Sequence, residues 1–253
     1  MLQIESPQRK RSTARKLSVG LASCEDDVLA AQRLRYRVFA DELGAHLDPR
    51  TPGVDHDIFD PYCEHLVVRD DTRGNIVGTY RILSPLAAQR IGGYYSENEF
   101  DLTRLRHLRP RIVEIGRSCI DPDYRSGAAI ALLWSGLARY MATMRYDYLL
   151  GCASISMADG GHAAASIYRA LGDKHACPPE YRVFPRCPLP LGALRVDFDC
   201  ALPPLLKAYL RAGAWICGAP AWDPDFNTAD LPILMQMNRV GAKYARHFVQ
   251  RAA

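Results

Sequence analysis

Two pairs of charged residues at short spacing could bind or activate a small polar molecule. Asp57 and Asp60 lie three positions apart in a segment rich in Pro and Asp, which predicts a loop. Such carboxylates could bind a cationic side chain or cap turns, and both interpretations stay open. Glu114 and Arg117 have the same spacing within RIVEIGRSCI, a sequence typical of a strand. On a regular strand their side chains point to opposite faces, so a direct pair would require a bulge or a twist.

Three arginines ahead of that strand could hold a carboxylate. Arg35 and Arg37 lie in a predicted helix, and Arg81 lies near the end of a predicted strand. A guanidinium can donate two parallel hydrogen bonds to one carboxylate. Arg35 or Arg37 could therefore bind the carboxylate of a substrate, or could tie the loop that contains the two aspartates to the sheet. Arg81 has the same two possibilities.

A possible phosphate site lies at the start of a predicted long helix. Arg125, Ser126 and Gly127 lie where this helix begins, and the helix is expected to run from about 127 to 144. The free backbone N–H groups and the dipole at a helix start suit a phosphate group. A simple N-terminal turn is the alternative interpretation.

Three other side chains are assigned structural roles at first sight. Cys119 follows Glu114 by five residues, but no basic His is near it in sequence, so it is interpreted as a packing residue rather than a nucleophile. His162 follows two glycines and is interpreted as a helix-start residue. Phe39 is expected in the core or along an apolar tunnel.

The elements that must position these residues follow an α/β order. Strands are predicted at 17–22, 65–70, 75–83, 111–120, 147–155 and 227–235, and helices at 25–43, 127–144, 163–172 and 203–213. We expect a central mixed sheet flanked by helices in a single domain over 17–253, with a C-terminal extension from about 200. Residues 1–16 are expected to form a flexible basic arm.

Composition excludes several classes of protein. The chain has 253 residues, of which 48% are hydrophobic and 24% charged, so collagenous, disordered and repeat architectures are excluded. It has neither a run of 18 apolar residues nor an apolar secretory signal, so we expect a cytoplasmic protein. Its eight cysteines form no CxxC pair and have no His at ligand spacing, which argues for reduced thiols and against a zinc site or a disulfide framework.

The net charge of +4 does not predict a nucleic-acid partner, but the charges are unevenly distributed. Basic residues gather at 9–16, 104–111 and 239–251, whereas acidic residues gather around 55–60. A basic rim fits an acidic protein or an anionic membrane, and an acidic loop fits a cationic amino acid. Ordinary solvated loops are the alternative interpretation.

A combination of separated residues gives a sharper indication. The pattern consists of Arg35, Phe39, Asp57, Asp60, Arg81, Glu114 and Arg117. Together they resemble the acyl-homoserine-lactone synthases and their relatives, the ornithine-lipid N-acyltransferases, which share a GNAT-like fold. The segments LRYRVFADELG, EIGRSCIDPDYRSG and GAPAWDPDFNTADLPIL favour the ornithine-lipid branch.

Two departures from related patterns accompany this resemblance. The lactone synthases usually carry a Trp shortly after the first helix, where this chain has Gly44 and Ala45. The pyrophosphate loop of acetyltransferases is present only in a degenerate form at residues 125–129. A pantetheine arm without a nucleotide would need less of that loop, because it brings one phosphate to the helix start.

The resemblance implies a specific reaction. The enzyme would move a (3-hydroxy)acyl chain from the 4′-phosphopantetheine of acyl-carrier protein to the α-amine of L-ornithine, forming lyso-ornithine lipid, with neither metal nor separate cofactor. Glu114 would help deprotonate the amine, residues 125–127 would bind the donor phosphate, and the substrates would be bound by Arg35, Arg37, Phe39, Asp57, Asp60, Arg81 and Arg117. Peripheral contact with an anionic membrane is also implied.

Two alternatives stay open. One is lactone synthesis from S-adenosylmethionine. The other is a non-catalytic module that binds acyl-carrier protein.

Overall fold

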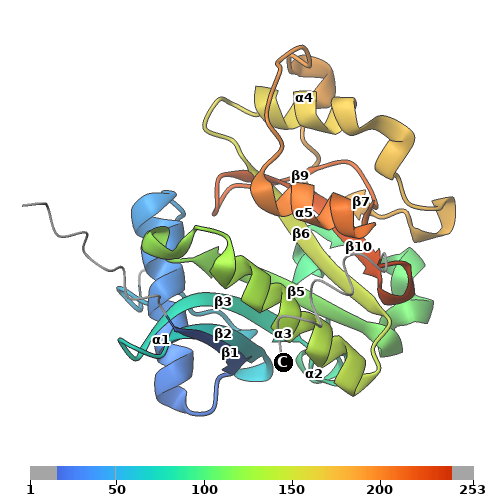
Figure 1. Ribbon diagram of the computed structural model, residues 1–253. Coiled ribbons are helices and arrows are strands. Elements are labelled where there is room, and N and C mark those ends of the chain that lie inside the picture. Colours follow the sequence, from blue (N-terminus) through green and yellow to red (C-terminus); the bar gives the residue numbers. More distant parts are fainter. Residues whose placement is uncertain (1–15, 49, 241–253) are drawn as a thin grey trace, which may run out of the picture.

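The computed structural model describes residues 16–48 and 50–240 (Figure 1). Nearly all of the expected basic arm and of the basic segment 239–251 lies outside these residues. The strands of the main sheet are β1 (Leu17–Leu21), β2 (Glu64–Asp70), β3 (Asn75–Leu83), β5 (Ile112–Ile120), β6 (Tyr148–Ser156), β8 (Trp215–Ile216), β9 (Ala221–Asp223) and β10 (Thr228–Gln236). Their order is β1-β2-β3-β5-β6-β10-β8, with β9 paired to β10.

Helices cover both faces of this sheet. They are α1 (Glu25–Tyr36), α2 (Pro85–Ile91), α3 (Ala128–Met144), α4 (His162–Leu171) and α5 (Pro204–Ala212). Successive side chains of β2 point to opposite faces of the sheet. Leu66 and Val68 pack in the core under α3, whereas Val67 packs against α1. The small pair β4 (Phe100–Asp101) and β7 (Phe184–Pro185) lies apart from the main sheet.

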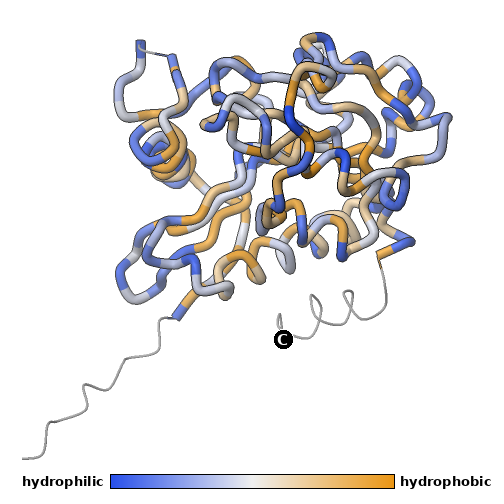
Figure 2. The backbone as a smooth tube through the Cα atoms, turned by 90° about the horizontal axis from the view of Figure 1, so that it is seen from above, coloured by the Kyte–Doolittle hydropathy of each residue, from blue (hydrophilic) through white to orange (hydrophobic). Residues whose placement is uncertain are grey.

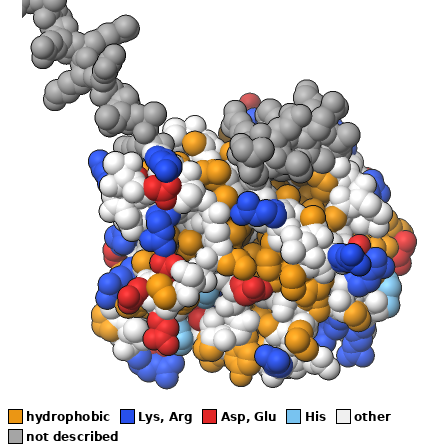
Figure 3. Space-filling view, turned by 60° about the horizontal axis from the view of Figure 1, so that its bottom comes forward, with side chains coloured by type: hydrophobic (Ala, Val, Ile, Leu, Met, Phe, Trp, Pro, Cys, Tyr) orange, Lys and Arg blue, Asp and Glu red, His pale blue; other side chains and the backbone are white. Residues whose placement is uncertain are grey.

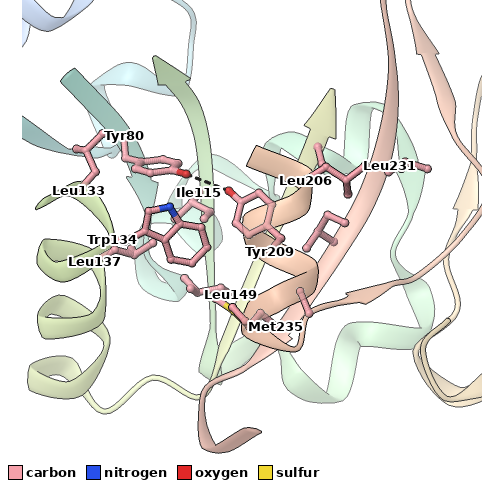
Figure 4. Close-up of a cluster of buried hydrophobic side chains, with 14 of the residues drawn as sticks. Tyr80, Ile115, Leu133, Trp134, Leu137, Leu149, Leu206, Tyr209, Leu231 and Met235 are labelled. Carbon is pink, nitrogen blue, oxygen red and sulfur yellow. Dashed lines mark hydrogen bonds between the residues drawn. The ribbon is translucent and has the colours of Figure 1, made fainter. Parts of the chain in front are cut away.

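The main core lies between the sheet and helices α3 and α5. Trp134 on α3 packs against Tyr209 on α5, with ring centroids 5.1 Å apart, and the hydroxyl groups of Tyr209 and Tyr80 are hydrogen-bonded at 3.2 Å (Figure 4). Figure 2 shows hydrophobic residues concentrated in the strands and in the helices packed on them. Residues beyond 200 are part of this core, because β10 pairs with β6 along its whole length.

The two halves of the sheet are joined by a short parallel ladder. It pairs Ile112 with Tyr148, Val113 with Leu149, and Glu114 with Leu150. Beyond Glu114, β5 continues against β3 and β6 continues against β10, but the two strands no longer pair with each other. The sheet therefore splits after the pair Glu114–Leu150, and β5 beyond this pair is no longer in register with β6.

A bulge distorts β5 directly after the split. Gly116 faces Arg81 and Cys119 faces Thr79, so two residues of β5 oppose the single residue Tyr80 on β3. Arg117 lies in this bulge with φ of 50°, in the left-handed region. This bulge is therefore the irregularity that Glu114 and Arg117 need for their side chains to lie on the same face of the sheet.

Two segments differ from their expected form. The helix predicted at 25–43 ends as a π-helix over Arg37–Glu42, which contains Phe39. The basic run expected as a loop is a 3-10 helical stretch over Thr103–Arg111. With three residues per turn, it buries Leu105 and Leu108 and points the intervening polar residues outward.

Candidate active site

A cavity of about 230 Å3 lies where β5 and β6 separate. Tyr80, Leu205 and Tyr209 line it from the side of α5, whereas Phe39 and Tyr95 line it from the opposite face of the sheet. Its remaining polar lining residues are Cys63, Arg81, Ser96, Glu99, Glu114, Arg117, Ser118, Cys152, Ser154, Asp223 and Asp230. Because the sheet splits here, chemical groups that enter from its two opposite faces could meet in the same small cavity.

Glu114 is held in this cavity by three hydrogen bonds. It is 4% exposed, and its Oε2 accepts from the backbone N–H of Tyr95 at 2.6 Å. Its Oε1 accepts from the backbone N–H of Ser96 at 2.8 Å and from the Ser96 hydroxyl at 2.5 Å. Burial raises the pKa of Glu114, against the opposing effect of these hydrogen bonds. A carboxylate of this kind, fixed in place and more basic than usual, suits proton transfer.

Arg117 lines the same cavity as Glu114 but pairs with other carboxylates. Its Nε lies 3.2 Å from Oδ2 of Asp55, and its Nη2 lies 3.3 Å from Oδ2 of Asp57. The guanidinium also lies between two aromatic rings, 4.9 Å from the centroid of Tyr95 and 4.4 Å from that of Phe226. The positive φ at the bulge thus places Arg117 where it closes one wall of the cavity.

Arg35 ties the aspartate loop to α1. Its side chain is 0% exposed and does not line the cavity. Its Nε donates to Asp55 at 2.7 Å, and its Nη1 and Nη2 donate to the two oxygens of Asp60 at 2.8 and 3.0 Å. Of the two possibilities weighed for Arg35, this geometry supports the structural one. Asp55, which the sequence interpretation did not single out, completes the arrangement.

Arg81 extends the same network toward the cavity. Its Nη1 donates to Asp57 at 2.6 Å and to Asp60 at 3.0 Å, and Arg81 also lines the cavity. Three arginines and three aspartates therefore alternate in space across α1, the loop and the sheet. The acidic loop around 55–60 is neutralised by these arginines and does not present free negative charge.

The other predicted site residues lie in different places. Phe39 lines the cavity, and its ring contacts that of Phe226 edge-on at 5.6 Å. Arg37 does not line it: its exposed side chain lies 3.7 Å from Asp121. Arg125 donates to both carboxylate oxygens of Glu42, at 2.5 and 2.7 Å.

Residues 125–127 do not line the cavity either, but they lie close to the split along the chain. Seven residues separate the end of β5 at Ile120 from the start of α3 at Ala128. Gly127 is the N-cap of α3 and has φ of 99°, a conformation that favours glycine. With Arg125 engaged by Glu42, a phosphate here would rely on backbone N–H groups.

Cys119 packs in the cluster formed with α1 rather than facing the cavity. Burial raises the pKa of its thiol to about 12, which keeps it protonated. His162 begins α4, and its Nδ1 accepts from the backbone N–H of Arg195 at 3.1 Å. Both placements agree with the structural roles expected for these residues.

Sequence interpretation missed one part of the cavity, a group of acidic side chains formed by Glu99, Asp223 and Asp230. Two of them lie in the segment GAPAWDPDFNTADLPIL, which served only as a resemblance motif. That segment was the available signal for Asp223 and Asp230, whereas nothing in the sequence around Glu99 distinguishes it from a surface carboxylate.

Several basic side chains of the run 103–111 already have partners within the protein. Arg109 pairs with Glu97, Arg111 pairs with Asp147, and Arg104 donates to the carbonyl of Pro179 at 2.8 Å. Figure 3 shows one face of the molecule, on which Lys and Arg side chains lie among apolar patches and acidic groups. Within the described ranges, none of the helices has the length and apolar character needed to cross a bilayer.

Comparisons with known proteins place this arrangement in a family. Residues 34–135 match the family model of the acetyltransferase (GNAT) domain. The L-ornithine N(alpha)-acyltransferase of Brucella abortus is 34% identical over 255 residues, covering 92% of this chain and 88% of that protein. The L-ornithine N(alpha)-acyltransferase of Rhodobacter capsulatus is 35% identical over 254 residues, covering 92% of this chain and 95% of that protein.

Solved structures agree on the fold. A CoA-dependent acyl-homoserine lactone synthase, BjaI, with MTA superposes with a TM-score of 0.57, covering 93% of this chain and 89% of that one. At 14% identity this likeness shows the fold alone, and it confirms the expected GNAT-like α/β architecture. The relatives that match across nearly the whole chain identify the protein as an acyltransferase that belongs to the L-ornithine N(alpha)-acyltransferase family.

Proposed function

We propose that this acyltransferase moves a 3-hydroxyacyl chain from acyl-carrier protein to the α-amine of L-ornithine, which yields lyso-ornithine lipid. The observation that carries the proposal is the buried carboxylate of Glu114, held in a cavity at the split between β5 and β6. The acceptor follows from the names of the relatives. The carrier-bound donor and its hydroxyl group follow from the family resemblance.

The chemistry requires a neutral amine, a stabilised oxyanion and a leaving thiol. Glu114 takes a proton from the α-ammonium, directly or through a water molecule. The amine then attacks the thioester carbonyl, so that a C–N bond forms and the C–S bond breaks. Backbone N–H groups of β5 beyond Glu114, where the ladder with β6 has ended, would donate to the oxyanion. The nitrogen loses its second proton as the C–S bond breaks, the departing thiolate takes up that proton to leave as a thiol, and no covalent enzyme intermediate forms.

The two faces of the sheet suit two different substrates. We assign the donor arm and acyl chain to the side of α5, where Leu205, Tyr209 and Tyr80 provide an apolar wall. We assign the amino acid to the opposite side, where the cavity shares Tyr95 and Arg117 with a wider surface hollow. The two reactants would then meet at Glu114 in the plane of the sheet.

The test is acylation by the purified protein. The donors are 3-hydroxyacyl-carrier protein and the matching acyl-CoA, the acceptors are a panel of amino acids and S-adenosylmethionine, and products are identified by mass. We expect N-acyl ornithine from the carrier-protein donor. Acylation of another amine in place of ornithine would contradict the acceptor and leave the mechanism intact. Carrier-protein binding without turnover of any amine would favour the binding module, and lactone formation from S-adenosylmethionine would favour the synthase.

Replacing Glu114 with Gln tests the proton transfer. Removal of a general base typically lowers the rate by about 100- to 10,000-fold, so kcat of this variant should fall in that range. In the wild type, the rate should rise as Glu114 loses its proton, at a pH above the ordinary Glu value of 4.5, and this rise should vanish in the variant. The exposed residue Glu180 provides a matched control, as Glu180→Gln. An unchanged kcat in a folded Glu114→Gln protein would remove Glu114 from the mechanism.

A further inference from the structure

Three carboxylates converge on the cavity from separate parts of the chain. Glu99 precedes β4, Asp223 ends β9, and Asp230 lies within β10. All three line the cavity that contains Glu114. One ligand-type atom each from Glu99, Asp230 and the thiol of Cys152 lies within 4.8 Å of the others. Two of these carboxylates are well buried, with Asp230 5% exposed and Asp223 9% exposed.

This carboxylate cluster, Glu99, Asp223 and Asp230, has no basic partner. In the described part of the chain, Lys, Arg and His side chains form ion pairs with other carboxylates but not with these three. Both carboxylate oxygens of Glu99 are buried, each with less than 1 Å2 of accessible area, and neither accepts from a conventional hydrogen-bond donor. The side chains that interact with Glu99 are the Asp230 carboxyl and the Cys152 thiol, and neither of them is basic. Burial of unpaired charge is costly, so the cluster must share protons or take up a cation from outside.

The chemistry of the site favours an ammonium group as that cation. A primary ammonium donates three hydrogen bonds, and the three carboxylates supply acceptors for all of them. Burial raises the pKa of the Cys152 thiol well above its usual value, so this residue adds no negative charge to the cluster. Burial and the neighbouring carboxylates raise the pKa of Glu99 to about 10, as expected for a group that lacks a cation.

We propose that Glu99, Asp223 and Asp230 bind the side-chain ammonium of the acceptor and select a diamino acid over neutral amino acids. This inference rests on the proposed function, because it assumes that the α-amine is acylated beside Glu114. The aspartates of the 55–60 loop are poor candidates for the same role, since Asp57 and Asp60 already pair with arginines.

A short route connects the cluster to Glu114. The Ser96 hydroxyl contacts Oε1 of Glu114 at 2.5 Å and the Cys152 thiol at 3.6 Å, and that thiol adjoins Glu99 and Asp230. An acceptor with its α-amine at Glu114 therefore needs only a short side chain to place an ammonium in the cluster. This separation favours short diamino acids.

The test compares L-ornithine with L-norleucine, in which a methyl group replaces the side-chain ammonium at the same chain length. With 3-hydroxyacyl-carrier protein as donor, we expect kcat/KM of the wild type to be higher for ornithine. In Asp230→Asn and Glu99→Gln, kcat/KM for ornithine should fall by about 10- to 100-fold, the usual effect of losing a charge-assisted hydrogen bond. The value for norleucine should hold or rise. Asp26→Asn, on the exposed start of α1, is the matched control.

Binding measured by calorimetry separates this inference from the proposed function. If the wild type acylates neither amino acid, the proposed function fails. A preference for binding ornithine that Asp230→Asn abolishes would still support the cluster. Equal losses for ornithine and norleucine in folded variants would assign the cluster a structural role and overturn the inference. A preference for ornithine that a chelator abolishes and a divalent metal restores would also overturn it. Should Asp230→Asn not fold, Asp223→Asn at the cavity wall serves in its place.

Discussion

Replacing Asp60 with Asn tests whether the buried ion network holds the site together. The substitution keeps the shape of the side chain and removes one negative charge. It leaves Arg35, which is 0% exposed, and Arg81, which is 4% exposed, with one fewer counterion each. The hydrogen bond from the Asp57 backbone N–H to Oδ2, at 3.1 Å, can persist only if the amide oxygen takes that position.

The size of the effect follows from the partners that stay in place. Removing one partner of a buried ion pair costs about 3 to 5 kcal/mol, because the remaining charge is left uncompensated. Asp55 still pairs with Arg35 and Asp57 still pairs with Arg81, so we expect the lower end, about 3 kcal/mol. With a urea m-value of about 3 kcal/mol/M, the unfolding midpoint should fall by about 1 M.

The pH dependence of this loss gives a second test. The guanidinium of Arg35 holds the pKa of Asp60 well below its usual value despite burial. Because the folded-state pKa lies below the unfolded-state pKa, the stabilisation is complete above pH 3.8 and is lost as the pH falls toward the folded value. Burial and Arg35 lower the pKa of His65, 3.7 Å from Asp60, so this residue adds no charge near neutral pH.

The assay is urea unfolding of wild type and Asp60→Asn, followed by circular dichroism at pH 8, 6 and 4, with Asp26→Asn as the control. The difference in midpoint should be equal at pH 8 and pH 6 and should begin to narrow only near the lowest pH. A shift below about 0.3 M at pH 8 would refute the reasoning, because it would mean that the two arginines do not need this charge. A difference that changes between pH 8 and pH 6 would point to another titrating group.

Two further substitutions probe the split and the buried thiol. Gly151→Ala would place a Cβ 2.6 Å from the carbonyl oxygen of Ile115, just past the end of the β5–β6 ladder, and should lower stability by about 1 to 3 kcal/mol in urea unfolding. Unchanged stability would show that the halves of the sheet separate freely there. Cys119→Ala should keep kcat near the wild-type value, because the thiol is buried and protonated. Loss of turnover in the folded variant would establish an acyl-cysteine step.

Hydrophobic periodicity was sufficient to predict the six longer strands of the sheet and its long helices, because each buries a continuous apolar stripe. It missed the short strands β8 and β9, which span two and three residues. It failed where the period was unusual. Leu102, Leu105 and Leu108 repeat every third residue, the period of a 3-10 helix, and the arginines between them obscured the pattern. Helix α2 was missed despite Pro85 in its first turn and Gly92 at its end, since it spans only seven residues.

The ion network was only partly predictable from the sequence. Arg35 and Asp60 were singled out because they match a family pattern. A tie between the aspartate loop and the sheet was one of the two possibilities considered for Arg35. Asp55 is an equally acidic neighbour in the same loop, and only the fold shows that it receives a hydrogen bond from Arg35. The sequence also could not show which acidic residues are neutralised, because that depends on distances between segments far apart in the chain.

This distinction reverses the expected electrostatics of the site. The concentration of acidic residues near Asp57 and Asp60 suggested an anionic pocket there. In the structure, arginines from α1, β3 and β5 form ion pairs with these two aspartates. Arg117 takes part in this network because of the bulge in β5. In a regular strand its side chain would point to the face opposite Glu114, and Asp57 would have one fewer partner. Carboxyl groups that pair with no basic side chain among the described residues lie instead across the cavity, on three other segments. On the proposal above, a cationic acceptor would therefore bind at the carboxylates beside the split in the sheet rather than at this network.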